Sequence, residues 1–414
     1  MRKREKKHGK ILLITIFLLI IIAAIVYYFV GIRTVRENET ILDTSSGYVI
    51  TNKKVALYDE QYKEIGSIQK DITLKIKDNA EKNYLVVDNL DVKYYIKKEN
   101  ITPVKENDKI DDRYKNYIVF NENVVTQNKT DLYDEKGNLM YSLAKSYSLP
   151  IIVKETDKYG VEFGDRLVYI KEDDCTVVNN YNTKQTNTTG IATLNYHAFY
   201  DETNEEEKAA CNTVICHSKQ QFKEQLDLIR EMNLLTLKMK EVEMYIDGKI
   251  QLPKSVLITI DDGGRTQIAV DMLTEYKMYA TIFLVTSWYD PQSYYVTEYI
   301  ELHSHSHNLH NVGACPTGQG GGIQCLKEED IQNDLRISRE KLNQTTYFCY
   351  PFYEYNDYSI KMLKEAGFTM AFVGESTRGD NLVKVGSDKF RLPRFVIVNY
   401  TTDDNLRNYF NGMK

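Results

Sequence analysis

The feature that most constrains the fold is a short apolar run that ends in two carboxylates and two glycines. Residues 256–264 read Val-Leu-Ile-Thr-Ile-Asp-Asp-Gly-Gly. An unbroken run of β-branched and aliphatic residues predicts a strand buried on both faces, as in a parallel sheet. Asp261 and Asp262 end that run, and a glycine turn can direct both side chains into one cleft. One carboxylate could then bind a metal while the other acts as a base, although a turn that merely caps the strand is the alternative.

Residues 191–414 alternate strand-like and helix-like segments around this run. We expect strands at 192–197, 256–260, 280–285, 347–351, 368–373 and 390–398, and helices at 218–232, 239–246, 265–276, 330–342 and 359–366. Repeated strand–helix alternation predicts parallel strands, arranged in a barrel or in a doubly wound sheet. In a barrel, functional side chains gather at the carboxyl ends of the strands, which is where Asp261 and Asp262 fall.

A cluster of histidines offers further metal ligands. Residues 301–310 read Glu-Leu-His-Ser-His-Ser-His-Asn-Leu-His and hold four of the seven histidines in the chain. A single histidine is usually structural, whereas four so close together, in a domain that also offers paired carboxylates, indicate a metal site. Imidazole nitrogens and one carboxylate, with open positions for water, form the usual catalytic zinc sphere. The sequence therefore predicts a divalent metal, with zinc as the expected ion.

These motifs resemble those of the polysaccharide deacetylases of carbohydrate esterase family 4, the NodB-homology type, over residues 191–414. Thr259-Ile-Asp-Asp-Gly263 matches the first motif of that family. The resemblance implies an α/β fold with a distorted (β/α) barrel, in which Asp261 is the general base and Asp262 is a metal ligand. It also implies the reaction, which is hydrolysis of the N-acetyl groups of a polysaccharide to acetate and free amines.

The second motif of the family matches Glu301-Leu-His-Ser-His-Ser306, and this alignment implies that His305 is a metal ligand. The second ligand follows four residues later in most of the family, but five residues later in the branch that resembles poly-N-acetylglucosamine deacetylases. His310 fits the spacing of that branch. We therefore expect His305 and His310 to bind the metal, with His303 and His307 as the alternative pair.

The remaining family motifs are only partly present. Tyr350-Pro-Phe-Tyr353 resembles the third motif, which implies that the backbone N–H of Phe352 helps to bind the oxyanion. Cys349 stands where the family usually has an arginine, and the Asp-Trp and late Leu-x-His motifs are missing. Resemblance to the same branch implies that His197, in an early Tyr-His motif, is the general acid; a buried strand-end histidine is the alternative. Arg394 is our candidate to orient the base in place of the missing arginine.

The amino terminus predicts a single-pass membrane anchor. Six lysines and arginines in residues 1–10 precede an uncharged apolar run at 11–30. A bilayer-spanning helix needs about 20 such residues. The cationic flank should stay in the cytoplasm, so that everything after the run lies outside the cell membrane. A cleaved signal peptide is the alternative, but the end of the run, Tyr-Tyr-Phe-Val-Gly-Ile-Arg, lacks a small-x-small cleavage site.

The region between the anchor and residue 178 is predicted to be β-rich and duplicated. Leu57-Tyr-Asp-Glu60 recurs at 132–135, and Tyr95-Ile-Lys-Lys-Glu-Asn100 recurs in similar form at 169–174. The nearly constant offset indicates a tandem duplication. The short alternating strands resemble bacterial SH3-like domains, which often occur on cell-wall proteins. Binding to the wall and a spacer role are both open for them.

The predicted order is a cytoplasmic tail (1–10), a transmembrane helix (11–30), two SH3-like domains (40–105 and 115–178), a polar linker (179–190) and the deacetylase-like domain (191–414). The six cysteines are too few for a disulfide scaffold. Cys211 with Cys216, and Cys315 with Cys325, are candidates for local disulfides, which would fit an oxidising compartment.

These features together indicate a membrane-anchored enzyme that deacetylates N-acetylglucosamine residues of peptidoglycan. An exopolysaccharide deacetylase acting on poly-N-acetylglucosamine and an inactive wall-binding scaffold are the alternatives. The formal net charge of −6 argues against a nucleic-acid partner.

Overall fold

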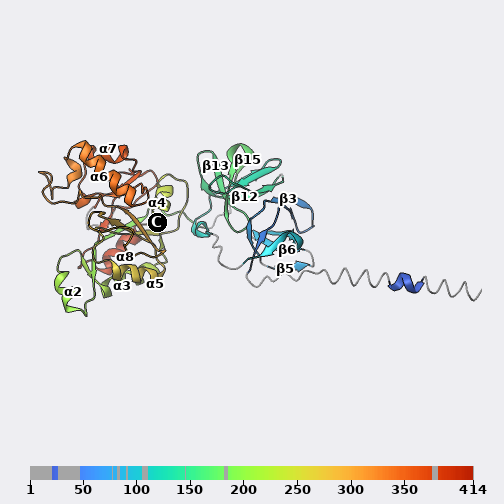
Figure 1. Ribbon diagram of the computed structural model, residues 1–414, viewed down its shortest axis with the longest axis horizontal. Helices are drawn as coiled ribbons and strands as arrows, with labels where there is room; N and C mark the ends of the chain where they lie inside the picture. Colours follow the sequence, from blue (N-terminus) through green and yellow to red (C-terminus); the bar gives the residue numbers. More distant parts are fainter. Residues whose placement is uncertain are drawn as a thin grey trace, which may run out of the picture. The chain divides into compact units, whose positions relative to one another are not determined.

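The computed structural model divides the chain into two compact units (Figure 1). The structure describes residues 21–26, 47–76, 78–81, 84–89, 92–104, 111–144, 146–180, 185–374 and 381–413. The first unit contains the described residues within 1–112, 126–147 and 162–170, and the second contains those within 113–125, 148–161 and 171–414.

Most of the predicted membrane anchor lies outside the described residues. Within 11–30, the structure describes residues 21–26, which are helical and exposed. Among the residues that the structure describes, no helix is both long and apolar enough to cross a membrane. The anchor and the membrane topology that follows from it therefore stay predictions.

The first unit consists of short antiparallel strands. One set has the order β4-β1-β8, and the other has the order β14-β10-β11-β3-β2-β7-β6-β5. The strands are β1 (Tyr48–Thr51), β2 (Val55–Tyr58), β3 (Glu64–Ile68), β4 (Thr73–Lys75), β5 (Asp78–Glu81), β6 (Tyr84–Asn89), β7 (Val92–Lys97), β8 (Ile101–Pro103), β10 (Thr130–Tyr133), β11 (Leu139–Leu143) and β14 (Leu167–Lys171).

The two sequence repeats occupy matching elements. In the first, Tyr58 of β2 pairs with Tyr95 of β7; in the second, Tyr133 of β10 pairs with Tyr169 of β14. The later strand of each pair runs into a one-turn 3-10 helix, η1 (Lys98–Asn100) or η3 (Glu172–Asp174). The shared order and register agree with a duplication, whereas the resemblance to SH3-like domains stays a prediction.

The second unit begins with four strands, in the order β15-β9-β12-β13. They are β9 (Glu122–Thr126), β12 (Ser148–Lys154), β13 (Lys158–Glu162) and β15 (Cys175–Asn179), and the 3-10 helix η2 (Arg113–Asn116) precedes them. Arg113 forms an ion pair of 2.7 Å with Glu241, which also accepts a hydrogen bond of 2.9 Å from the Tyr117 hydroxyl. These contacts tie η2 to the α/β part of the same unit.

A curved parallel sheet forms the centre of the second unit. Its strands have the order β24-β23-β22-β21-β20-β16-β25, with β19 beside β20. They are β16 (Ala192–Tyr196), β19 (Leu235–Thr236), β20 (Ser255–Ile260), β21 (Ala280–Leu284), β22 (Ile300–Ser304), β23 (Tyr347–Cys349), β24 (Met370–Phe372) and β25 (Phe395–Val396). Just before β25, Leu392 pairs in parallel with Phe372 of the opposite edge. The fold is thus mixed α/β with a half-barrel sheet, and every residue of β20 is buried.

Helices flank this sheet (Figure 1), and five of them follow the alternation that the sequence predicts. They are α2 (Glu205–Ala210), α3 (Lys219–Glu231), α4 (Met239–Ile246), α5 (Gln267–Tyr276), α6 (Glu328–Lys341), α7 (Asp357–Glu365) and α8 (Asp403–Asn411). The Ser218 side chain caps α3 by accepting a hydrogen bond from the Gln221 N–H. Phe222, Leu226 and Ile229 bury the apolar face of α3 in the core of the domain.

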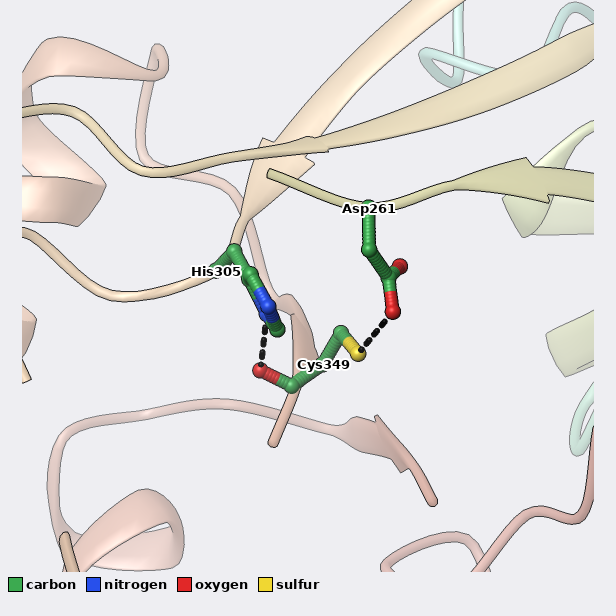
Figure 2. Close-up of side chains that lie close together, drawn as sticks. All are labelled: Asp261, His305 and Cys349. Atoms are coloured by element: carbon green, nitrogen blue, oxygen red, sulfur yellow. Dashed lines mark hydrogen bonds between the residues drawn. The ribbon is translucent and has the colours of Figure 1, made fainter. Parts of the chain in front are cut away.

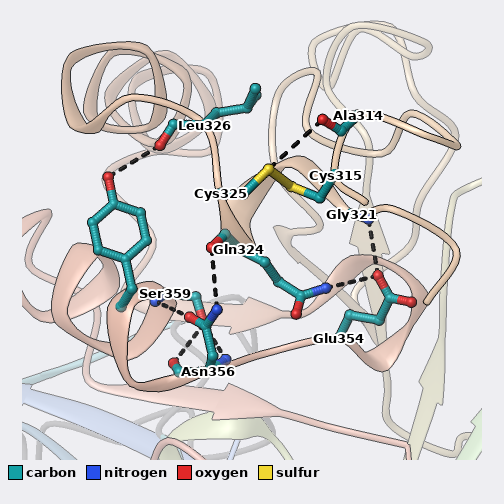
Figure 3. Close-up of a disulfide and its surroundings, with 10 residues drawn as sticks. Ala314, Cys315, Gly321, Gln324, Cys325, Leu326, Glu354, Asn356 and Ser359 are labelled. Carbon is teal, nitrogen blue, oxygen red and sulfur yellow. Dashed lines mark hydrogen bonds between the residues drawn. A yellow bond between two sulfur atoms is a disulfide. The ribbon is translucent and has the colours of Figure 1, made fainter. Parts of the chain in front are cut away.

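Both predicted local disulfides are present, Cys211–Cys216 and Cys315–Cys325. The second closes a glycine-rich loop that lies against Glu354 (Figure 3). The Glu354 carboxylate accepts hydrogen bonds from the Gly321 N–H at 2.9 Å and from the Gln324 side chain at 2.8 Å. The loop is therefore fixed to the residues that follow the third motif.

Candidate metal centre

The turn after β20 brings both carboxylates to one end of the sheet. The Asp261 N–H donates to the Tyr196 carbonyl of β16 at 2.9 Å, which continues the ladder by one residue. Asp262 and Gly263 then adopt positive φ angles of 73° and 95°. A side chain at Gly263 would lie 2.3 Å from Leu284, so the sharp turn requires glycine there.

Asp262, His305 and His310 converge on one point. The Asp262 Oδ1 atom lies 3.3 Å from the Nε2 atoms of both histidines. The Nδ1 atom of His305 is 2.9 Å from the Cys349 carbonyl and donates to it, which turns the Nε2 lone pair toward Asp262. Metal-binding histidines are usually oriented in this way. The structure thus brings together the three residues that the sequence predicted as ligands.

The donor set fits a divalent ion. Asp262 Oδ1 is buried and has no hydrogen-bond donor in the described part of the chain. Although burial alone would raise the pKa of Asp262, the His305 and His310 rings beside its carboxylate hold that pKa well below its usual range. A carboxylate that stays ionised beside two imidazole nitrogens within 4.8 Å matches the ligands that zinc prefers.

The alternative histidine pair lies elsewhere. His303 is half-buried within β22, and its Nδ1 atom is 2.7 Å from the Thr345 hydroxyl. Burial lowers the pKa of His303 to about 3, so its ring is neutral. His307 instead lies 3.0 Å from the Thr286 hydroxyl through Nδ1. Neither ring belongs to the cluster around Asp262.

Arg394 holds the second carboxylate. Its guanidinium donates to Asp261 Oδ1 at 2.7 Å and to Oδ2 at 2.8 Å, a bidentate pair that is fully buried. Arg394 Nε also donates to the Val373 carbonyl, which fixes the orientation of the fork. Burial alone would raise the pKa of Asp261, but the charge of Arg394 lowers it, so the carboxylate is ionised and able to accept a proton.

Cys349 lies close to both Asp261 and His305 (Figure 2). Its thiol is 3.4 Å from Asp261 Oδ2, and Arg394 donates to its sulfur at 2.8 Å. Asp261, His305 and Cys349 could together offer a second set of metal ligands. However, Arg394 already occupies both Asp261 oxygens, and its positive charge opposes a cation there. Burial also raises the pKa of the Cys349 thiol, which disfavours the thiolate.

His197 follows β16 on the same side of the sheet. Its Nε2 atom lies 3.2 Å from the Tyr353 hydroxyl, which donates to Asn195 Oδ1 at 2.8 Å. Burial lowers the pKa of His197, and the charges of Asp261 and Asp262 offset that effect in part. Asn195 and the Tyr353 hydroxyl were not predicted from the sequence. Asn195 could have been found, because it lies two residues before His197 and so faces the same side of the strand.

The third motif forms a strained turn. Phe352 and Tyr353 have φ angles of 57° and 62°, a conformation that costs about 1–3 kcal/mol for residues other than glycine. In the described part of the chain no hydrogen bond uses the Phe352 N–H. The Phe352 ring packs 4.2 Å from the ring of His310, so the turn lies beside the metal-ligand cluster.

These observations define a candidate mononuclear metal centre at the carboxyl ends of a parallel α/β sheet, with an ionised carboxylate beside it. Residues 249–371 match the model of the polysaccharide deacetylase family. That segment includes Asp261, Asp262, His305, His310 and Phe352, whereas His197 and Arg394 lie outside it.

Solved deacetylase structures are similar to the chain, and no curated protein sequence matches it. The chain is 19% identical to a de-N-acetylase from Aggregatibacter actinomycetemcomitans, with 53% of this chain and 99% of that chain covered and a TM-score of 0.45. It is 20% identical to IcaB from Ammonifex degensii (55% and 98% covered, TM-score 0.43). It is 16% identical to BC0361, a polysaccharide deacetylase from Bacillus cereus (75% and 93% covered, TM-score 0.43).

Proposed function

We propose that this chain is a metal-dependent polysaccharide N-deacetylase that acts on N-acetylglucosamine residues of peptidoglycan. The observation that carries the proposal is the convergence of Asp262, His305 and His310 beside an ionised Asp261. Metal-assisted amide hydrolysis requires ligands that hold a metal ion and a separate, ionised base. The match of residues 249–371 to the deacetylase family supports the same chemistry.

Asp262, His305 and His310 would hold the metal, with zinc as the expected ion. An ion bound there supplies Lewis acidity and lowers the pKa of water. Asp261 accepts a proton from the attacking water, and Arg394 keeps both of its oxygens oriented while it does so. Arg394 thereby compensates for the arginine that Cys349 replaces in the third motif.

The other candidate residues stabilise the oxyanion and protonate the leaving group. The Phe352 N–H donates to the oxyanion, a contact that in other enzymes is worth about 3–4 kcal/mol. His197 delivers a proton to the amine as it leaves. Burial lowers the pKa of His197, and the charges of Asp261 and Asp262 offset that effect only in part, so a protonated His197 gives up its proton readily. The Tyr353 hydroxyl, which donates to Asn195, orients the His197 ring.

The choice of peptidoglycan rests on the expected location. The apolar run at 11–30 and its cationic flank support a single-pass anchor in the cell membrane, with the catalytic domain outside. Two disulfides fit an oxidising compartment. The β-rich repeats would act as wall-binding modules or as a spacer. Poly-N-acetylglucosamine is the second candidate substrate, favoured by the Tyr196-His197 motif and by the spacing of His305 and His310.

Acetate release from purified peptidoglycan and from poly-N-acetylglucosamine tests this proposal directly. We expect zinc to copurify at one ion per chain and peptidoglycan to be the better substrate. Faster release from poly-N-acetylglucosamine would establish the second substrate instead. A chain that binds zinc but releases no acetate from either polymer would be a wall-binding scaffold. Recovery of the full-length chain in the membrane fraction tests the anchor separately, and a mature amino terminus just after residue 30 would contradict it.

A further inference from the structure

An exposed aromatic pair lies beside the candidate metal centre and takes no part in the chemistry above. Trp288 is the only tryptophan in the chain, and 47% of its surface is exposed. Its ring lies edge-on to the ring of His310, with the centroids 5.1 Å apart. Tyr289, the next residue, is also exposed, at 36%. Single exposed apolar side chains are common, but two adjacent exposed rings, one of them against His310, can mark a binding surface.

The backbone holds this pair firmly in place. The Val285 N–H donates to the Asp262 carbonyl, and the Ser287 N–H donates to the His307 carbonyl. Both Trp288 and Tyr289 donate their own N–H groups to the Val285 carbonyl. The segment is therefore bonded on one side to the turn after β20 and on the other to the loop that carries the histidine ligands. The backbone that carries the two rings is therefore fixed relative to the candidate metal centre.

Glycine at position 264 makes room for the second ring. A side chain added there would lie 3.2 Å from the Tyr289 hydroxyl, and one added at Gly263 would lie 3.1 Å from the Tyr289 ring. Tyr289 also packs edge-on against Tyr294, whose hydroxyl donates to the Gly263 carbonyl at 2.7 Å. The close approach of Tyr289 thus explains why glycine suits the second glycine position of the Asp-Asp-Gly-Gly turn.

We propose that Trp288 and Tyr289 form a stacking surface for a pyranose ring of the glycan, next to the N-acetyl group that reacts. This inference rests on the proposed function. Only two bonds, of about 1.3 and 1.5 Å, separate an acetamide carbonyl carbon from the sugar ring. A sugar whose acetamide lies at Asp262 and His310 must therefore place its own ring, or that of its neighbour, near Trp288.

The chemistry of the two rings suits a sugar. A pyranose presents C–H groups on its faces and hydroxyl groups around its edge. Tryptophan and tyrosine present an apolar face and a polar N–H or O–H at the rim, so that one ring can pack on the sugar face while its rim stays hydrogen-bonded. Both side chains also lose little conformational entropy when they bind, because each has only two χ angles.

The single tryptophan provides a direct test. The experiment is a titration of the full-length Asp261→Asn variant, in which turnover is blocked, with the N-acetylglucosamine pentasaccharide. Tryptophan fluorescence reports the binding. Saturable quenching or a blue shift is expected. Calorimetry should show about tenfold weaker pentasaccharide binding for Trp288→Ala, which corresponds to 1.4 kcal/mol, and a smaller loss for Trp288→Phe. Tyr400→Ala, which removes an aromatic ring that is 66% exposed outside this segment, should bind as tightly as the parent.

The outcomes separate this inference from the proposed function. A fluorescence change in a chain whose unmutated form releases no acetate would support sugar binding and refute deacetylation. Acetate release with unchanged fluorescence and unchanged affinity in Trp288→Ala would refute the stacking surface and leave deacetylation intact. If Trp288→Ala lost zinc but kept its affinity for the pentasaccharide, Trp288 would only shield His310, and the inference would also fail.

Discussion

Two histidines on one strand show how position along the sheet decides the role of a side chain. His303 and His305 are two residues apart, so both face the same side of β22 and its extension. His303 lies one layer lower, where its ring packs 4.9 Å from Tyr347 and 6.4 Å from Phe283. His305 lies past the end of the strand and reaches Asp262. We call the residues level with His303 the lower layer, whose rings pack against one another. We call those level with His305 and Asp262 the upper layer, which carries the candidate chemistry.

The same division holds on β20. Thr259, in the lower layer, donates its hydroxyl to the Leu194 carbonyl and accepts a hydrogen bond from Arg394. Asp261, two residues later, accepts hydrogen bonds from two nitrogens of the same guanidinium. Arg394 therefore spans the two layers. The candidate ligands lie where the strands end, as the functional side chains of barrels usually do.

The largest effect is expected from replacing His305 or His310 in the upper layer. His305→Ala and His310→Ala each remove one of three expected ligands, so zinc retention and acetate release should both be lost. His303→Ala should instead leave a cavity in the core, with a loss of about 2–4 kcal/mol in the free energy of unfolding and most of the zinc retained. Metal analysis and urea unfolding of the purified variants measure the two effects.

The matched control is His307→Ala, which removes a partly exposed ring outside the cluster and should change neither quantity much. Zinc loss in His303→Ala or His307→Ala, with retention in His305→Ala, would show that the ligands belong to the other register.

The residue that spans the layers should give the next largest effect. Arg394→Ala leaves Asp261 buried and unpaired, which should cost about 3–5 kcal/mol in the free energy of unfolding. Activity should fall as well, because the base loses its fixed orientation. Arg394→Lys keeps the charge but cannot form the bidentate pair, so it should recover stability better than activity. Calorimetric unfolding and acetate release measure the two separately. Full activity in Arg394→Ala would mean that Asp261 needs no orientation.

A smaller and more selective effect is expected at His197. His197→Ala should lower amide hydrolysis by about 10²–10⁴ and retain zinc, since the ring lies outside the ligand set. Aryl acetate esters need no proton on their leaving group, so their hydrolysis should fall much less. The variant should also lack the loss of rate at rising pH that deprotonation of His197 causes. Because burial lowers the pKa of His197, that loss should begin at lower pH than for an exposed histidine. Equal loss of ester and amide turnover would exclude His197 as the acid.

The division into layers also explains how much could be predicted from sequence. The strand at 256–260 was predicted because a fully buried strand has an unbroken apolar pattern, and α4 was predicted at the bounds that the structure has. The convergence of Asp262, His305 and His310 could be predicted because the family motifs relate residues that are distant in sequence. Their roles stay predictions until the variants are measured.

Other parts could not be predicted, for physical reasons. The acidic helix α2 buries no residue, so it has no apolar periodicity to detect. The contact between Tyr353 and His197 depends on a left-handed turn and on the curvature of the sheet, neither of which has a local pattern. By contrast, α8 buries Leu406, Tyr409 and Phe410 at spacings of three and four, so that helix was missed although its signal was present.

The mildest test concerns the residue that supports the upper layer from α6. The Asp334 carboxylate accepts hydrogen bonds from the His307 and Asn308 N–H groups, at 2.8 and 2.6 Å, and so fixes the loop between His305 and His310. Burial raises the pKa of Asp334 to about 6, even though these two hydrogen bonds lower it. The folded chain therefore binds this proton more tightly than the unfolded chain does. As the pH rises from about 4 to 6, the contribution of Asp334 to stability must fall.

Asp334→Asn removes that titration and keeps one acceptor. The difference in unfolding free energy between the unmutated chain and Asp334→Asn should shift by about 1–3 kcal/mol in favour of the variant as the pH rises from 4 to 6, and then stay constant. Urea unfolding of both chains, after removal of metal, measures it. The variant should nevertheless bind zinc more weakly, because one N–H of the ligand loop loses its acceptor. A pH-independent difference would mean that Asp334 is ionised over this whole range. If Asp334→Asn were more stable than the unmutated chain but bound zinc more weakly, Asp334 would place the candidate ligands at a cost in stability.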